Sequence, residues 1–311
     1  MTTEEKEQFE NGVRAYLEEN YTPDVNEKHL FKVFIPNESE EKEEKKESIK
    51  RVFDDFNSAS LKYSGKRNGC TRITKITPAL QKLIQDNKLD FDDERNIVKL
   101  TKRNSDIIED LINKDENYYP FARTLYSYFI SLYGIEGFKE NKEKSLFAVL
   151  REIDRDNSTN VWRYKHRSNF NSCVEYISNP ENHFFVRLEG GDPALPDEIV
   201  NSCGTPLKSL SSKICKYLSE WMYPKKDNYF INDSFVRHVL PFYLDYYGVE
   251  KKDNKGNTIK GSTDIDKLGY ESLFDLLRRL NDVAAKENNG VKLSKSRLDH
   301  ILWYCYKSFK L

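Results

Sequence analysis

The chain has no run of 18 or more apolar residues, and its first 20 residues carry charges from the fourth position onward. We therefore expect neither a transmembrane span nor a secretory signal peptide. Five cysteines are scattered along 311 residues without a CxxC pair. The sequence thus predicts neither a disulfide framework nor a metal site, and it favours a reducing, cytoplasmic location.

Signatures of several enzyme classes are also missing. The histidines are far apart and form no HExxH pair, and the glycine-rich segment 189–192 is not followed by a GK[ST] or GxGxxG pattern. Ser-His-Asp and Cys-His catalysis stay open, although no nucleophile-elbow motif supports them. We expect no cofactor and no membrane partner, and a monomer.

Charge is unevenly divided along the chain. The net charge is −1 overall, yet residues 201–311 hold 19 Lys and Arg against 13 Asp and Glu, a net of +6. A basic region of this kind is what binding along nucleic-acid phosphates requires. Ordinary scatter of surface charge explains the same excess equally well, so both interpretations stay open.

Apolar periodicity predicts a mostly α chain. We expect residues 1–100 to form an N-terminal accessory region, with a helical start, a β-like run at 30–35 and a charged tether at 37–50. Residues 101–311 are expected to form a helical domain. The aromatic-rich run 183–191 is interpreted as a short strand or a buried extended piece. The remaining helices are expected at 49–63, 78–86, 105–113, 120–133, 143–153, 195–200, 270–285 and 294–309.

The segment 204–247 contains two further amphipathic helices. Apolar residues recur from Ile214 to Met222 and again from Val236 to Tyr247 at the spacing of one helix face. Lys213 stands at the start of the first helix. Asp233 stands just before the second, 20 residues later, in the favoured position of a helix N-cap.

This pairing resembles the active site of the helix-hairpin-helix DNA glycosylases, the superfamily of endonuclease III and 8-oxoguanine glycosylase. Bifunctional members have a Gly-hydrophobic-Gly-x-Lys hairpin and an aspartate about 20 residues after the lysine. Residues 209–213, Ser-Leu-Ser-Ser-Lys, match the hairpin, and residues 230–236 match the aspartate segment. Both hairpin glycines are serines here, which departs from the pattern because serine tolerates φ > 0 and close phosphate approach less readily.

The resemblance implies a glycosylase-like helical domain with its hairpin at 204–216, and an enzyme that excises a damaged or modified base from DNA. Lys213 would be the nucleophile that forms a Schiff base and permits strand cleavage, and Asp233 would stabilise positive charge on the sugar. The target could be a host lesion or a modified phage base, which keeps a phage-defence role open. DNA contacts are expected from Lys208, Ser209, Ser211, Ser212 and Lys216, and a base pocket from Tyr217, Trp221 and Trp303.

Each of these residues also has a purely structural interpretation. Asp233 is what helix capping alone would select, and Tyr217 and Trp221 are equally typical of a helical core. A non-catalytic helical module that binds DNA or another protein is therefore the alternative to the enzyme. Borohydride trapping on modified DNA separates the two, because only a Schiff-base enzyme becomes cross-linked.

Overall fold

The computed structural model describes residues 69–113, 121–140, 145–157, 159, 161, 166–260 and 262–309. The helices, β-like run and charged tether predicted within residues 1–63 lie outside this part of the chain. The accessory region is thus described only from Gly69 onward.

The described part of the chain is predominantly helical, as predicted. One two-stranded hairpin, which the sequence analysis did not predict, pairs β1 (Phe91–Asp92) with β2 (Ile97–Val98). The helices are α4 (Gly69–Gln85), α5 (Lys102–Asn113), α6 (Phe121–Glu140), α7 (Phe147–Asp156), α8 (Arg167–Ser178), α9 (Phe184–Gly190), α10 (Leu195–Cys203), α11 (Lys208–Met222), α12 (Ser234–Tyr246), α13 (Ser262–Lys267), α14 (Tyr270–Glu287) and α15 (Lys295–Phe309). In addition, 3-10 turns span Pro180–Asn182 and Thr205–Leu207.

The chain divides into two compact units, residues 1–68 with 117–152 and residues 69–116 with 153–311. The expected boundary at residue 100 between an accessory region and a helical domain stays a prediction. In the described part of the first unit, α6 contains a break at Gly134, where φ is 70°. Tyr126 and Phe138, on either side of the break, form an edge-to-face ring pair at 5.1 Å.

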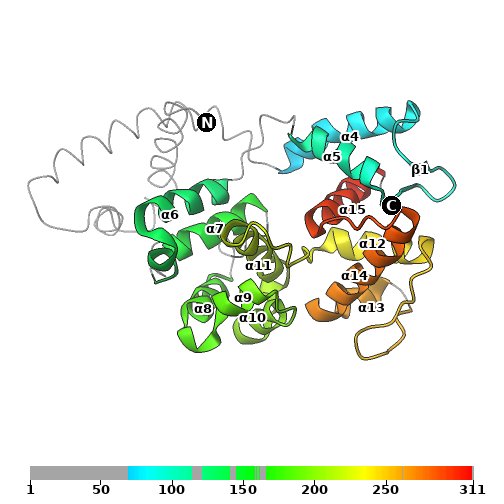
Figure 1. Cartoon of the computed structure of the whole chain (residues 1–311). Coiled ribbons are helices and arrows are strands. Elements are labelled where there is room, and N and C mark those ends of the chain that lie inside the picture. The colour runs from blue at the N-terminus through cyan, green and yellow to red at the C-terminus, as the bar shows by residue number, and fades with distance from the viewer. Residues whose placement is uncertain are drawn as a thin grey trace, which may run out of the picture. The chain divides into compact units, whose positions relative to one another are not determined.

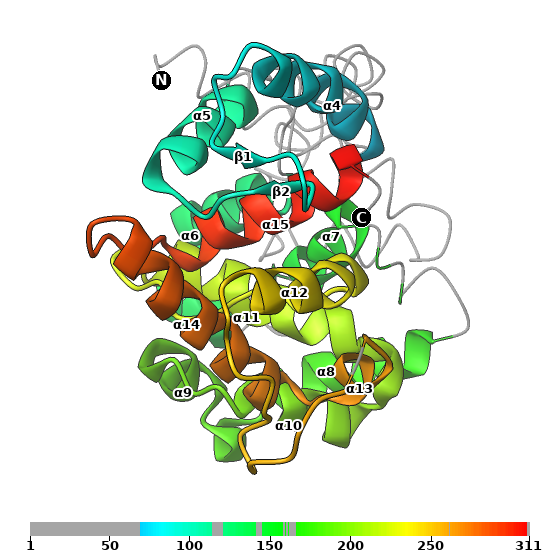
Figure 2. The same ribbon diagram turned by 90° about the vertical axis from the view of Figure 1, so that its right-hand side faces the viewer.

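In the second unit, buried apolar residues of α4, the β-hairpin, α5, α12, α13, α14 and α15 form one core cluster. Helix α15 packs against α12, α4 and α5, while α10 packs against α8 and α11 (Figures 1 and 2). Tyr243 in α12 and Tyr247 just after it form hydrogen bonds to the β-hairpin segment. Tyr243 donates to the Val98 carbonyl at 2.8 Å, and Tyr247 accepts from the Leu100 N–H at 2.7 Å. These buried hydroxyls have the partners that burial requires.

A tight connection joins α10 to α11. Gly204 has φ of 111°, and an added Cβ would lie 2.4 Å from Asn169 Nδ2. That amide donates to the Cys203 carbonyl at 2.6 Å and so holds the end of α10. Glycine is required at this position by both conformation and space. The hairpin between the two helices is therefore the segment 204–207.

The interpretation of residues 183–191 as a strand or extended piece is wrong, because they form helix α9. Phe184 and Leu188 are four residues apart and both are buried, so one helix face supplies the apolar contacts. Gly191 ends the helix in the left-handed conformation, with φ of 72°. In so short an apolar run, period alone does not separate helix from strand.

Candidate functional site

Lys213 is buried in the second turn of α11. Only 6% of its surface is exposed. Within the described residues its amino group forms neither a hydrogen bond nor an ion pair within 4.0 Å. Burial lowers the pKa of Lys213, and the charges of Asp233, Asp299 and Asp154 act in the opposite direction. A buried amine with a lowered pKa is the state in which lysine acts as a nucleophile.

Asp233 is the N-cap of α12, and it uses one carboxylate oxygen for that purpose. Its Oδ1 accepts from the Phe235 N–H at 3.0 Å and from the Val236 N–H at 2.9 Å. Its Oδ2 accepts no hydrogen bond from any residue that the structure describes. Capping therefore leaves one oxygen of this nearly buried carboxylate available for another role.

The segment before Asp233 is anchored on three sides. The Asn232 N–H donates to Ser212 Oγ of α11 at 2.9 Å, and Arg237 Nε donates to Asn232 Oδ1 at 2.6 Å. The Tyr270 hydroxyl bonds both the N–H and the carbonyl of Phe230 at 2.9 Å. Since these partners come from α11, α12 and α14, the position of the Asp233 backbone is set by the tertiary structure.

Arg237 has no carboxylate within ion-pair distance among the described residues. Besides Asn232, its guanidinium donates to the main-chain carbonyls of Ile265 and Leu268. Burial lowers the pKa of Arg237, while Asp266, Asp197 and Asp233 favour its charge. This side chain places a cation near the start of α12 and joins it to α13 and the end of the following loop.

Asp299 belongs to the same buried group, and the sequence analysis did not identify it. It lies on α15 and is 9% exposed, with no hydrogen-bond or ion-pair partner among the described residues. Burial, and to a lesser extent the charge of Asp233, raise the pKa of Asp299 to about 7. His300, Lys216 and Lys213 act to lower it. No local motif marks this residue, because its neighbours are distant in the sequence.

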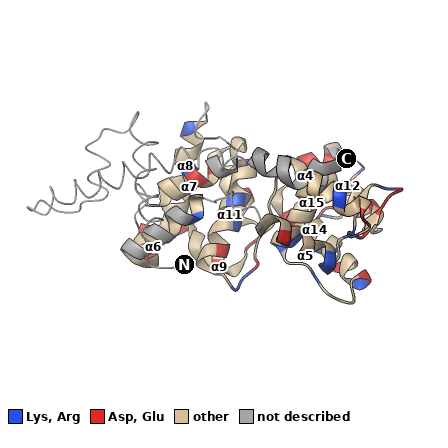
Figure 3. Ribbon diagram, turned by 90° about the horizontal axis from the view of Figure 1, so that it is seen from above, with Lys and Arg blue, Asp and Glu red and all other residues tan. Residues whose placement is uncertain are grey.

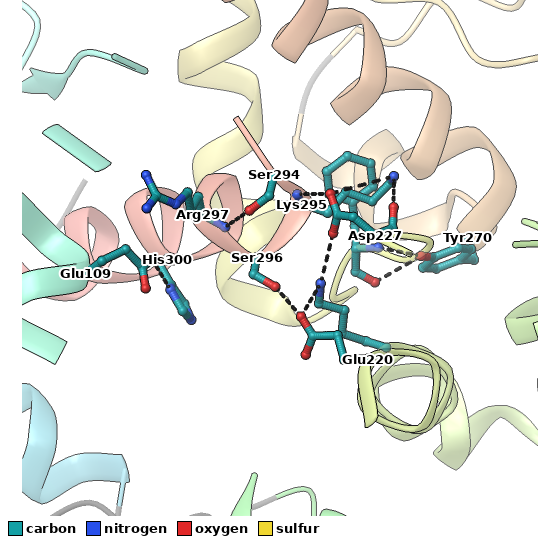
Figure 4. Close-up of polar contacts among 11 residues, drawn as sticks. Glu109, Glu220, Asp227, Tyr270, Ser294, Lys295, Ser296, Arg297 and His300 are labelled. Carbon is teal, nitrogen blue, oxygen red and sulfur yellow. Dashed lines mark hydrogen bonds and ion pairs between the residues drawn. The ribbon is translucent and has the colours of Figure 1, made fainter. Parts of the chain in front are cut away.

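The first turn of α15 is fixed against α11 by a polar network (Figure 4). Lys216 Nζ lies 2.9 Å from Glu220 Oε1 and 3.3 Å from Asp227 Oδ1. Ser296 donates to the same Glu220 oxygen, and the Lys295 N–H donates to Asp227 Oδ2 at 2.6 Å. Asp299 is three residues after Ser296, so it lies on the face of α15 that this network holds toward α11.

A third carboxylate, Asp154 near the end of α7, also acts on Lys213. Its Oδ1 accepts from Thr159 Oγ1 at 2.6 Å and from the Val161 N–H at 2.9 Å. Asp154 is 2% exposed. These donors hold the Asp154 carboxylate in a loop-fixing arrangement, so Asp154 is better suited to a structural role.

The predicted hairpin at residues 209–213 is wrong. Residues 209–213 belong to α11, which begins at Lys208, and the hairpin is the preceding segment 204–207. Ser211 and Ser212 are buried, and their hydroxyls donate to the carbonyls of Lys208 and Ser209. Lys213 thus stands in the second helical turn and does not open the helix. The sequence lacks the two hairpin glycines of the glycosylase pattern, which would disfavour a helix at residues 209–211.

The two lysines predicted to bind DNA differ in their surroundings. Lys216 is 3% exposed and is held by Glu220 and Asp227. A phosphate would have to displace these two carboxylates. Lys208 is half-buried and donates to the Asp266 carbonyl at 2.6 Å. Its location at the first residue of α11, beside the hairpin, is compatible with a phosphate contact.

The three aromatic residues predicted for a base pocket fall into two groups. Tyr217 and Trp221 stack with ring centres 5.6 Å apart, and the Tyr217 hydroxyl donates to Asn157 Oδ1 at 2.9 Å. Trp303 lies on α15, one turn after Asp299, with an edge-to-face contact to Phe235 at 6.3 Å. Trp303 is therefore the aromatic residue whose contacts reach the start of α12.

Several basic residues of the segment 201–311 are paired with neighbouring acids. Arg278 pairs with Asp275 and Asp282, and Arg279 also pairs with Asp275. Figure 3 shows acidic and basic residues interspersed along the second unit. The net charge of this region therefore does not by itself define a continuous basic surface.

Comparison of the chain with protein-family models, with curated proteins and with solved structures finds no match. The described residues include no group of three or more His, Cys, Asp or Glu side chains arranged to hold a metal ion. None of the helices that the structure describes is both long and apolar enough to cross a membrane.

Proposed function

We propose that this protein is a DNA glycosylase that uses Lys213 as its nucleophile and Asp233 as its charge-stabilising carboxylate. The observation that carries the proposal is the pairing of a buried, unpartnered lysine with an N-cap aspartate that keeps one oxygen unused. A buried charge without a partner is costly, so such an amine is expected to have a function.

The two residues suit the two halves of the reaction. Breaking an N-glycosidic bond leaves positive charge on the sugar, which a carboxylate in a water-poor site stabilises strongly. A neutral lysine amine then captures the sugar carbon. The bond from that carbon to the ring oxygen breaks as the oxygen takes up a proton, and the strand is cleaved from the resulting Schiff base by β-elimination. The base must first leave the duplex, and Trp303, which contacts Phe235 in the first turn of α12, would stack against it.

The test is base release followed by mass spectrometry on duplexes that carry a panel of oxidised, alkylated and hypermodified bases. The hypermodified group tests the possibility that phage DNA is the target. Borohydride is added in parallel to trap the lysine on the DNA. We expect Lys213→Gln to abolish the cross-link while DNA affinity and the urea midpoint stay close to those of the wild type.

Lys208→Gln is the matched control, because it removes a lysine five residues away from the same helix. It should weaken DNA binding but still cross-link once bound. A Lys213→Gln protein that still becomes cross-linked would remove Lys213 from the mechanism. If the wild type binds DNA but releases no base from the panel and is never trapped, the chain is the non-catalytic binding module.

A further inference from the structure

Three buried ionisable side chains from three different helices converge in the second unit: Lys213 of α11, Asp233 at the start of α12 and Asp299 of α15. The Ser212–Asn232 hydrogen bond connects the first two elements, and the Glu220–Ser296 hydrogen bond connects α11 to α15. Packing of Phe235 against Trp303 connects α12 to α15. The proposed reaction uses the lysine and the N-cap aspartate and leaves Asp299 without a role.

We propose that Asp299 is the general acid of this site and donates the proton that Schiff-base formation at Lys213 requires. This inference rests on the proposed function, since it assigns a further residue to the same chemistry. Asp299 is buried, is free of hydrogen-bond partners among the described residues, and lies on the α15 face that is held toward α11.

The charged groups around Asp299 explain why it differs from the other two aspartates. Asp233 approaches from α12, Lys213 and Lys216 from α11, and His300 is adjacent on α15. On the side of α5, Asp106 forms an ion pair with Arg297, and Glu109 Oε1 lies 2.6 Å from His300 Nδ1. Burial is the largest influence and raises the pKa of Asp299 to about 7, so a substantial fraction of the carboxyl group still holds its proton at neutral pH.

The step can be written with all atoms balanced for a simple aldehyde, which stands in for the sugar. In DNA the ring oxygen takes up the proton in place of the hydroxyl group, and the ring opens where water would leave. The neutral Lys213 amine adds to an aldehyde carbon, an N–C bond forms, and the proton lost from nitrogen is taken up by the former carbonyl oxygen. The Asp299 carboxylic acid then donates its proton to that hydroxyl group, the C–O bond breaks, and water leaves. The product is an iminium ion at Lys213 beside the Asp299 carboxylate, which regains a proton from solvent.

This order of events uses the environment twice. Before reaction, a neutral carboxylic acid does not favour protonation of the Lys213 amine. After reaction, the carboxylate that has formed stabilises the new iminium cation. Asp233 is less suited to this task, because its Oδ1 is already engaged by two main-chain N–H groups in capping α12. Asp154 is likewise engaged by Thr159 and Val161.

The test uses the full chain and a small aldehyde in place of DNA. Glycolaldehyde and cyanoborohydride are supplied over a range of pH, and the reduced adduct on Lys213 is quantified by peptide mass spectrometry. The wild type should give a bell-shaped profile, with a rising limb from Lys213 deprotonation and a falling limb from Asp299 ionisation. Asp299→Asn should lower the neutral-pH rate by about 10²-fold and abolish the falling limb.

Asp154→Asn is the matched control, since it removes a second buried carboxylate that acts on Lys213. It should keep the bell shape. If Asp299→Asn scales the whole wild-type profile by one factor, or leaves it unaltered, Asp299 is not the acid. Infrared difference spectra give an independent readout: the band of a protonated carboxylic acid at pH 6 should vanish in Asp299→Asn, and an unchanged spectrum overturns the proposal.

The outcomes for this inference and for the proposed function are distinguishable. A normal aldehyde profile with no base release from DNA would retain the acid and reject the glycosylase. Base release and trapping on DNA with an unaltered Asp299→Asn profile would retain the glycosylase and reject the acid.

Discussion

The main-chain N–H of Asn232 donates a 2.9 Å hydrogen bond to Ser212 Oγ, which ties the residue before Asp233 to the residue before Lys213. The Ser212 hydroxyl in turn donates to the Ser209 carbonyl at 3.0 Å. One serine thus satisfies a buried N–H outside its own helix and fixes the relation between the two proposed functional residues.

Ser212→Ala should therefore destabilise the protein and reduce base release. It leaves the Asn232 N–H without an acceptor, which costs roughly 1–3 kcal/mol for a buried donor. Urea unfolding measures the loss of stability, and single-turnover base release measures the displacement of Asp233. Ser211→Ala is the control, because among the described residues that hydroxyl bonds only the Lys208 carbonyl of its own helix, at 3.3 Å. Equal effects from both serines would contradict the role of Ser212 as a tie.

Asp233→Asn and Asp233→Ala separate capping from catalysis. Asparagine caps a helix about as well as aspartate, so its cost in unfolding free energy should stay under ~1 kcal/mol, whereas alanine should cost about 1 kcal/mol. Both changes remove the carboxylate and should lower the rate of base release by about 10²-fold or more. An Asp233→Asn protein that releases base at the wild-type rate would make Asp233 a cap alone.

The raised pKa of Asp299 predicts a pH dependence of the unfolding free energy that can be measured without any substrate. Its pKa is about 7 in the folded protein against 3.8 for the ordinary group, so the folded state holds the proton over a range where the unfolded chain has lost it. The contribution of Asp299 to stability is therefore complete below pH 3.8 and is lost as the pH rises toward 7.

Asp299→Asn should remove this loss of stability with rising pH, because asparagine does not ionise. The variant should be more stable than the wild type at pH 8, by up to roughly 4 kcal/mol, and the difference should shrink toward pH 4. Urea midpoints at several pH values check the trend. A difference that is constant across this range would mean that Asp299 titrates at its ordinary value.

Lys208 and Lys216 should respond differently to neutralisation. Lys208→Gln should reduce the slope of log affinity against log salt by about one, because one phosphate contact is lost. Lys216→Gln should leave that slope unchanged, since the charge of Lys216 is already paired with Glu220 and Asp227. It should instead cost roughly 2 kcal/mol of stability, less than a fully buried pair because both carboxylates are about a third exposed. Equal slopes for both variants and the wild type would place the DNA elsewhere.

Local sequence determined much of the architecture. Helices α11 and α12 were predictable because their apolar residues recur with the helical period, and Asp233 was recognisable as a cap because its signal lies within three residues. A pattern that involves only residues close together in the sequence can be recognised without knowledge of the fold. Where a local signal is ambiguous, as in the run that became α9, the prediction was wrong, because the burial of Phe184 and Leu188 decided between helix and strand.

Only the tertiary structure decided which residues share the site. Asp299 lies far from Lys213 in the sequence, and the packing of α15 against α12 and its polar link to α11 bring it into the same buried group. The same packing buries Lys216, which the sequence presented as a surface cation. Charge, pKa and accessibility depend on neighbours contributed by distant segments, so the sequence named Lys213 and Asp233 by their local pattern, and the fold determined the surroundings of both.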